Sequence, residues 1–418
     1  MTDRNPSPLQ SNSESNRSDS GTRTSKVVFY VNGVPIDVSW MPRQAWIALG
    51  IAVPIIAIPI IFTTQFSTKT SFKNSPPTVT ETADRSTAAE PNPNATKPSP
   101  SAEEEIATYT EAIRLNPNNS DAYNDRGVAY GEIGDFENAL ADFETVVRLS
   151  PDDSLGYINR GAAKLNLGDT AGAMADFETA AGLGSQDILL YFNRALAKAE
   201  LGDIEGALED YTKAASAAAE DTNALDVDNI RAESLGNRGD LKFDQEDLAG
   251  AIADFDQAIA LDPDNPDYRF TRGLAKELQG DDVGALEDYS ATLELDPNYA
   301  SAYSLRGGIH NTAENYDAAI SDFSTAIRLD PQNINNYTSR GLAYEFAGDW
   351  EAAFADYDEA LRRDATFADA FYGRGIVKVE LGDRPGAIAD LTQAAELFQQ
   401  QGNTTTYQDV VNYLQELE

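Results

Sequence analysis

The sequence predicts an all-α protein, a solenoid of helix-turn-helix repeats preceded by a single transmembrane helix. Two observations lead to this fold class. Residues 120–401 match themselves at a shift of 34 residues, and residues 45–62 form an uncharged apolar run. The 418-residue chain contains no cysteine, which excludes a disulfide framework, and its 41% hydrophobic content is enough to bury a core.

The first 44 residues are predicted to contain little packed structure. Residues 1–25 are rich in Ser, Asn, Asp and Arg and poor in large apolar side chains, so we expect a disordered tail. In residues 26–44, two apolar runs flank Asn32-Gly33, a dipeptide that suits a tight hairpin turn. Pro35 confines the second strand to a sheet edge. We therefore predict a juxtamembrane β-hairpin, although a plain linker is an equal alternative.

Residues 45–62 (AWIALGIAVPIIAIPIIF) are predicted to be an uncleaved transmembrane helix. Eighteen residues at about 1.5 Å each span about 27 Å, close to the hydrocarbon thickness of a bilayer. Five basic residues ahead of this run favour a cytoplasmic tail, which places the repeats on the extracytoplasmic side of the membrane (Arg4, Arg17, Arg23, Lys26 and Arg43). Residues 63–101, dominated by Thr, Ser, Pro and Asn, are expected to form a flexible linker.

An arginine followed by Gly or Ala marks each of eight repeats between residues 120 and 401 (Arg126, Arg160, Arg194, Arg238, Arg272, Arg306, Arg340 and Arg374). The interval from Arg194 to Arg238 is 44 residues instead of 34, which places an insertion at 222–231. An aromatic or bulky residue precedes each Arg by three positions, and a small Ala follows it by thirteen, a helical spacing. Gly-Asp pairs between the two apolar stretches indicate a turn followed by a helix N-cap.

The period, the small residues at the helix crossing and the closing Asp-Pro, as at Asp262-Pro263, resemble the tetratricopeptide repeat, and the Arg-Gly variant is most similar to bacterial, including cyanobacterial, members. Residues 102–119 fit a further half repeat. Residues 402–418 have one apolar stripe, as expected of a capping helix. The resemblance implies a right-handed superhelix whose first helices line a concave groove that binds proteins.

Every repeat with the arginine also has an aspartate sixteen residues later. We interpret the pairs as a structural ladder along the solenoid, with a phosphate or carboxylate receptor as the alternative. The ladder comprises Arg126 and Asp142, Arg160 and Asp176, Arg194 and Asp210, Arg238 and Asp254, Arg272 and Asp288, Arg306 and Asp322, Arg340 and Asp356, and Arg374 and Asp390.

The groove positions implied by the resemblance are unusually apolar, which favours an amphipathic or extended apolar partner segment, although neighbouring repeats can bury any one of these residues. The predicted partner-binding residues are Leu155, Ile158, Leu189, Phe192, Leu196, Phe270, Leu274, Phe346, Tyr372 and Ile376. Certain members of the family clamp a terminal carboxylate with Lys, Arg and Asn. The corresponding positions here hold no Lys or Arg, so the clamp is not expected.

The charge balance excludes several classes of function. Residues 101–418 carry 22 basic and 62 acidic side chains, which repel phosphate backbones, so we expect no nucleic-acid partner. His310 is the only histidine, and without a second His or any Cys we interpret it as a packed residue and expect no metal, cofactor, catalytic residue or small-molecule substrate. The sequence thus predicts a membrane-anchored, non-enzymatic scaffold that binds other proteins. The alternative is a regulatory or substrate-recruiting subunit of a separate enzyme.

Overall fold

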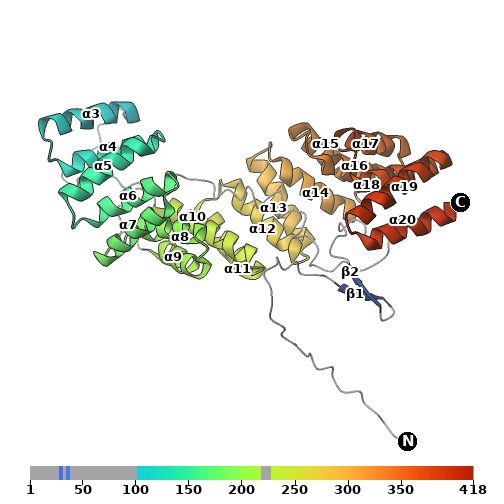
Figure 1. Ribbon diagram of the computed structural model, residues 1–418, viewed down its shortest axis with the longest axis horizontal. Helices are drawn as coiled ribbons and strands as arrows, with labels where there is room; N and C mark the ends of the chain where they lie inside the picture. Colours follow the sequence, from blue (N-terminus) through green and yellow to red (C-terminus); the bar gives the residue numbers. More distant parts are fainter. Residues whose placement is uncertain (1–27, 32–33, 38–100, 218–226, 418) are drawn as a thin grey trace, which may run out of the picture.

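The computed structural model describes residues 28–31, 34–37, 101–217 and 227–417. In these ranges it contains eighteen α-helices, α3 to α20, which follow one another as a continuous stack (Figure 1). Helices adjacent in sequence pack against each other along the whole stack. The predicted all-α solenoid is confirmed.

Each repeat contributes two helices of similar length. The first helices are α4 (Ser120–Glu132), α6 (Ser154–Asn166), α8 (Ile188–Glu200), α10 (Val227–Asp244), α12 (Pro266–Leu278), α14 (Ala300–Thr312), α16 (Ile334–Ala347) and α18 (Ala368–Glu380). The second helices are α5 (Phe136–Leu149), α7 (Thr170–Gly182), α9 (Ile204–Ser216), α11 (Leu248–Leu261), α13 (Asp282–Leu295), α15 (Tyr316–Leu329), α17 (Trp350–Arg363) and α19 (Arg384–Gln400).

The two sets of helices form an inner and an outer layer. First helices of successive repeats contact each other directly, as α6 does with α8 and α16 with α18, whereas second helices of successive described repeats make no comparable contact. Helices that approach one another lie on the inside of a curved stack. The first helices therefore form the concave layer.

The turn between the two helices explains the recurrent Gly-Asp pair. Gly168, for example, has a φ of 80°, a left-handed conformation that costs other residues free energy, and Asp169 then caps α7 by accepting a hydrogen bond from the Gly172 amide. Two repeats place a side chain in the same conformation, with φ of 63° at Glu246 and 61° at Glu314.

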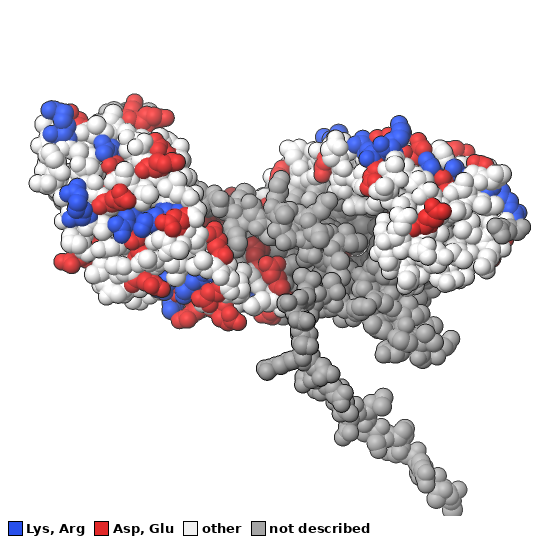
Figure 2. Space-filling model, in the orientation of Figure 1, with Lys and Arg blue, Asp and Glu red and all other residues white. Residues whose placement is uncertain are grey.

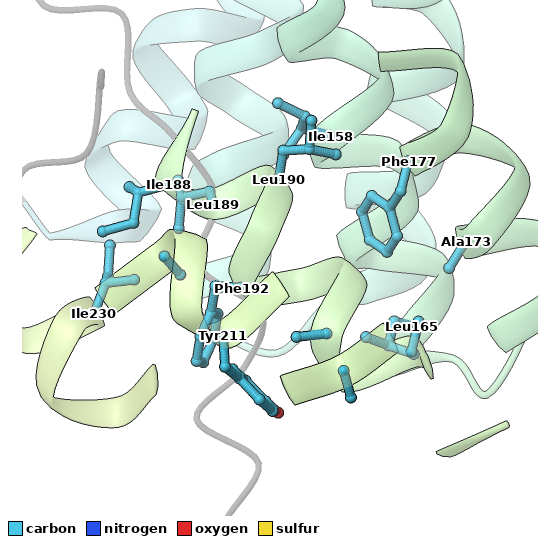
Figure 3. Close-up of a cluster of buried hydrophobic side chains, with 14 of the residues drawn as sticks. Ile158, Leu165, Ala173, Phe177, Ile188, Leu189, Leu190, Phe192, Tyr211 and Ile230 are labelled. Atoms are coloured by element: carbon cyan, nitrogen blue, oxygen red, sulfur yellow. The ribbon is translucent and has the colours of Figure 1, made fainter. Parts of the chain in front are cut away.

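The core runs between the layers and is largest around the third repeat. Phe177, Leu189, Phe192 and Tyr211 are all buried there. Figure 3 shows the Phe192 and Tyr211 rings side by side, with 6.2 Å between their centroids and an edge-on geometry. Ile230, from the amino-terminal part of α10, joins the same cluster.

The ends of the solenoid and the insertion depart from the regular unit. Helix α3 (Ala102–Leu115) packs on α4, and α20 (Thr404–Leu417) packs on α19. Helix α10 begins five residues earlier, relative to its arginine, than the other first helices, so residues 227–231 of the insertion extend it by more than a turn. Residues 218–226 lie outside the described ranges.

In the amino-terminal region the structure describes only two strands. Strand β1 (Val28–Val31) pairs antiparallel with β2 (Val34–Asp37), with Phe29 opposite Ile36. The predicted tail at 1–25, the transmembrane helix at 45–62 and all of the linker at 63–101 except Ser101, which caps α3, lie outside the described residues.

None of the helices in the described ranges is long and apolar enough to cross a bilayer. The longest, α10, has 18 residues but carries Asp, Glu, Lys and Arg along its length. Charged groups are costly in a hydrocarbon environment, so such a helix does not qualify as a span. On this finding we correct the single-pass membrane localisation predicted from the sequence, together with its extracytoplasmic placement of the repeats.

Candidate partner-binding surface

Each of the eight arginines lies against the aspartate sixteen residues later and donates two hydrogen bonds to it. Nε and one terminal nitrogen contact the two carboxylate oxygens at distances between 2.5 and 3.0 Å. The aspartates on the second helices are buried, and the arginines are mostly buried. This two-point geometry fixes the angle between the helices of a repeat.

In five repeats a lysine four residues after the arginine contacts the same aspartate. These lysines lie 2.7 or 2.8 Å from the carboxylate (Lys164, Lys198, Lys242, Lys276 and Lys378). Burial alone raises the pKa of Asp210, but hydrogen bonds from Arg194 and Lys198 outweigh burial and hold it below its usual value. In the seventh repeat Tyr344 replaces the lysine, and burial raises the pKa of Asp356 despite Arg340.

The arginines also connect neighbouring repeats, a contact that the sequence analysis missed. In six repeats the second terminal nitrogen reaches back to a polar side chain on the preceding second helix, at 2.6 to 3.2 Å (Thr110, Thr212, Asp256, Ser290, Ser324 and Asp358). Five of these residues stand sixteen positions before their arginine, and Thr212 stands ten further back because of the insertion. The recurrence of a polar residue at this spacing would have predicted the contact between repeats from the sequence.

Four of the predicted groove residues are buried. Ile158, Leu189 and Phe192 belong to the core cluster of the second to fourth repeats. Phe270 packs against Tyr289 and Tyr299, with 5.9 and 4.7 Å between ring centroids. These side chains contribute to folding of the solenoid and present little surface to a partner.

The other six predicted groove residues keep part of their surface accessible. Leu155, Leu196, Leu274, Tyr372 and Ile376 are partly exposed, and Phe346 is 40% exposed. Leu196, Leu274 and Ile376 occupy equivalent positions, two residues after the arginine. We call the residues at this position the +2 row; its members are Val128, Ala162, Leu196, Asp240, Leu274, Gly308, Leu342 and Ile376. From Leu196 onward all are partly exposed on the inner helices.

Asn159 and Asn193 occupy equivalent positions, one residue before the arginine, on two successive inner helices. The Asn159 side chain donates a hydrogen bond to Oδ1 of Asn124 in the preceding repeat, at 2.8 Å. Asn193 occupies the position of Asn159 one repeat later, but the residue corresponding to Asn124 is then Ile158, which offers no acceptor. Asn193 is fully buried, and neither its amide nitrogen nor its oxygen has a hydrogen-bond partner.

His310 lies at the position that holds the ladder lysine in five other repeats. Burial lowers its pKa, although Asp322 acts in the opposite direction. Among the described residues no group of three or more His, Asp or Glu side chains has a metal-binding arrangement. The ladder occupies nearly all the Lys and Arg side chains of the inner helices, and apolar and acidic residues remain accessible there.

Surface charges are mixed on the face shown in Figure 2. Lys and Arg side chains alternate with Asp and Glu over the end of the solenoid formed by α3 to α9, and no continuous basic surface is visible in that view (Figure 2). On this face the described residues therefore do not present the continuous basic surface that nucleic acids bind.

Comparisons with known proteins agree with the repeat architecture. Family models described as tetratricopeptide repeat match residues 108–141, 125–188, 189–221, 284–334 and 338–402, and one described as TPR repeat matches 239–280. No curated protein sequence matches the chain.

Several solved structures are similar to parts of the chain. A crystal structure of MamA protein is 25% identical over 44% of this chain and 95% of its own, with a TM-score of 0.39. A TPR repeat-containing protein from Cytophaga hutchinsonii is 17% identical over 59% of this chain and 97% of its own, with a TM-score of 0.49. Yeast Tom70 is 21% identical over 72% and 73% of the two chains, with a TM-score of 0.35. The family models and the eight two-helix repeats together establish that this chain belongs to the tetratricopeptide repeat family.

Proposed function

We propose that this protein is a scaffold that holds a segment of another protein against the concave layer of its solenoid. The observation that carries the proposal is the +2 row. Leu196, Leu274, Leu342 and Ile376 stand at the same place on four inner helices and remain partly exposed. A series of accessible apolar side chains along one concave surface suits an extended or helical partner segment.

The role proposed is binding rather than catalysis. The ladder uses eight buried aspartates and most basic side chains of the repeats for internal ion pairs, so these charges support the shape of the solenoid. Phe346 and Tyr372 add aromatic surface beside the +2 row, and aromatic side chains are frequent anchors in protein interfaces.

The experiment compares two aspartate substitutions in the full chain. Leu342→Asp places a charge in the +2 row on α16, and Val283→Asp places the same charge on α13, where Val283 is 70% exposed. Affinity-tagged wild type and variants are expressed in the native cells, and co-purified proteins are quantified by mass spectrometry. Thermal melting of each variant, with Leu342→Ser as a milder change, checks that the fold is retained.

We expect Leu342→Asp to reduce the recovery of specific partners by at least about tenfold, since a buried unpaired charge in an interface costs more than 1.4 kcal/mol. Val283→Asp should leave recovery unchanged. If folded Leu342→Asp or Leu342→Ser protein recovers the same partners as wild type, the concave layer is not the binding surface.

A further inference from the structure

Asp240 is the one charged member of the +2 row. It lies on α10, two residues after Arg238, with Leu196 and Leu274 at the equivalent positions on the flanking inner helices. At this one repeat the +2 row therefore presents a carboxylate between two apolar side chains. A ligand that lies along the row meets apolar, acidic and apolar side chains in succession.

No basic residue within the described ranges pairs with Asp240. The arginines and lysines of the inner helices are engaged elsewhere. The ladder uses nearly all of them, Arg231 pairs with Asp228, and Arg269 donates a hydrogen bond to the carbonyl of Pro263. Arg238 and Lys242, on the same helix as Asp240, both contact Asp254. Among the residues that the structure describes, Asp240 is therefore a carboxylate without a counter-charge.

The surroundings of Asp240 disfavour its ionised form. Burial raises its pKa to about 7, and the charges of Asp244 and Asp267 act in the same direction. The titratable groups that face it come from its own helix, from α9, from α12 and from the turn before α14 (Asp244, Tyr211, Asp267, Tyr268 and Tyr299). All of them are acids. A cation is therefore the group that this position lacks.

Unpaired buried polar groups lie in the neighbouring third repeat. The Tyr211 hydroxyl is close enough to Asp240 for that charge to raise its pKa, after the larger effect of burial. It makes no hydrogen bond of normal geometry, although the side chain of Asn237 is near enough to lower its pKa. Asn193, with a donor and an acceptor both unused, lies next to Phe192, whose ring contacts Tyr211. Buried groups of this kind are normally satisfied by a partner.

We propose that the concave surface of α8, α10 and α12 binds a lysine or arginine side chain of an extended partner segment, with Asp240 as its counter-charge and Leu196 and Leu274 contacting apolar side chains on either side. The inference rests on the proposed function and specifies the chemistry of the partner. The Asp240 carboxylate attracts a basic side chain, and the leucines on either side favour a partner with apolar residues flanking that side chain.

The spacing of the row also sets the spacing of the ligand. Packed helices lie about 8–10 Å apart, and an extended chain advances about 3.3 Å per residue. One repeat therefore corresponds to about three residues of ligand. The expected recognition pattern is an apolar residue, a Lys or Arg three positions later, and a second apolar residue after three more.

Selection from a random peptide library displayed on phage tests the pattern. The full-length wild type, Asp240→Asn, Asp240→Lys and the control Glu287→Gln are used as targets in 150 mM salt. Glu287 is an exposed carboxylate on α13, so its replacement changes the net charge as Asp240→Asn does but leaves the concave surface intact. Thermal melting accompanies each selection, because removal of a carboxylate without a counter-charge in these acidic surroundings should raise the melting temperature.

We expect wild type and Glu287→Gln to enrich peptides with Lys or Arg between two apolar residues at the stated spacing. Asp240→Asn should lose this preference and Asp240→Lys should favour Asp or Glu. A selected peptide labelled with fluorescein should bind Asp240→Asn at least about tenfold more weakly, although that variant melts higher. If Asp240 had only a structural role, its replacement would not weaken peptide binding while raising the melting temperature.

The two proposals fail in different ways. If peptides are enriched and Leu342→Asp abolishes their binding, but Asp240→Asn selects the same sequences as wild type, the cation site is wrong and the scaffold function stands. If Glu287→Gln weakens binding as much as Asp240→Asn does, the attraction is general electrostatics and the site is again wrong. If no sequence is enriched over bare support, both the groove and the cation site are refuted.

Discussion

Replacement of Asp254 by alanine tests whether the Arg and Asp ladder stabilises the solenoid. The Asp254 side chain is 3% exposed and accepts hydrogen bonds from Arg238 at 2.8 and 2.6 Å, while Lys242 lies 2.7 Å away. Asp254→Ala removes the only negative charge of this group and leaves two cations, 13% and 23% exposed, without a partner.

Loss of one partner of a buried ion pair costs about 3–5 kcal/mol, because the remaining charge stays desolvated. Arg238 and Lys242 keep some access to water, which reduces this cost by screening. We therefore expect Asp254→Ala to destabilise the fourth repeat by about 3 kcal/mol, the lower end of the range.

Hydrogen exchange followed by mass spectrometry is the appropriate assay, because unfolding of a repeat array need not be two-state. A loss of about 3 kcal/mol corresponds to about a hundredfold lower protection of amides in α10 and α11. The triple variant Arg238→Met, Lys242→Met and Asp254→Leu, which removes all three charges, should recover most of this protection. Unchanged protection in Asp254→Ala would refute the ladder as a source of stability.

Three further changes have defined outcomes. Glu246→Gly should raise the melting temperature by relieving the left-handed φ of 63°, a gain of about 1 kcal/mol, and a lower melting temperature would show that the side chain itself contributes. Gly161→Ala should destabilise by about 1–3 kcal/mol in urea unfolding, since its Cβ would lie 2.5 Å from the Phe177 ring, and a neutral result would mean that the ring moves freely. Asp240→Asn should change how stability depends on pH. The folded pKa of Asp240, about 7, lies above its usual value of 3.8, so its contribution to stability is complete below about pH 4 and is lost as pH rises through 7. The melting temperature of the variant should therefore exceed that of wild type at pH 8 and equal it near pH 4. A difference in melting temperature that stays constant across this range would contradict the raised pKa.

The repeat architecture could be predicted because it depends on residues that recur at fixed spacing. Each 34-residue unit repeats the same helix crossing, so the register of one unit identifies the others, and the Asp sixteen residues after each Arg identifies its ion-pair partner. Gly134, Gly168 and the glycines equivalent to them mark the turn in six of the eight copies because the turn requires a left-handed φ, and Glu246 and Glu314 adopt the same φ in the other two.

Exposure of the groove residues was harder to predict. The resemblance places Leu189 and Phe192 on the concave side, but in the structure both belong to a core cluster that includes Ile230, from the helical part of the insertion. Leu189 is buried there although the equivalent Leu155 is partly exposed, whereas Phe192 is buried as Ile158 and Phe270 are at the same position of regular repeats. The role of Asp240 also depends on its context, since its isolation follows from the use of Arg238 and Lys242 by Asp254.

The most direct measurement of the central claim is site-specific photo-crosslinking in the native cells. A benzophenone amino acid is placed at Leu196 or Leu342 on the inner helices, and at Val283 or Glu287 on α13, in otherwise unchanged full-length protein. If the solenoid holds a partner against its concave layer, the inner positions crosslink to the same polypeptide, in one contiguous segment, and the outer positions do not. Crosslinks to that polypeptide from Val283 and Glu287 but not from Leu196 and Leu342 would contradict the account.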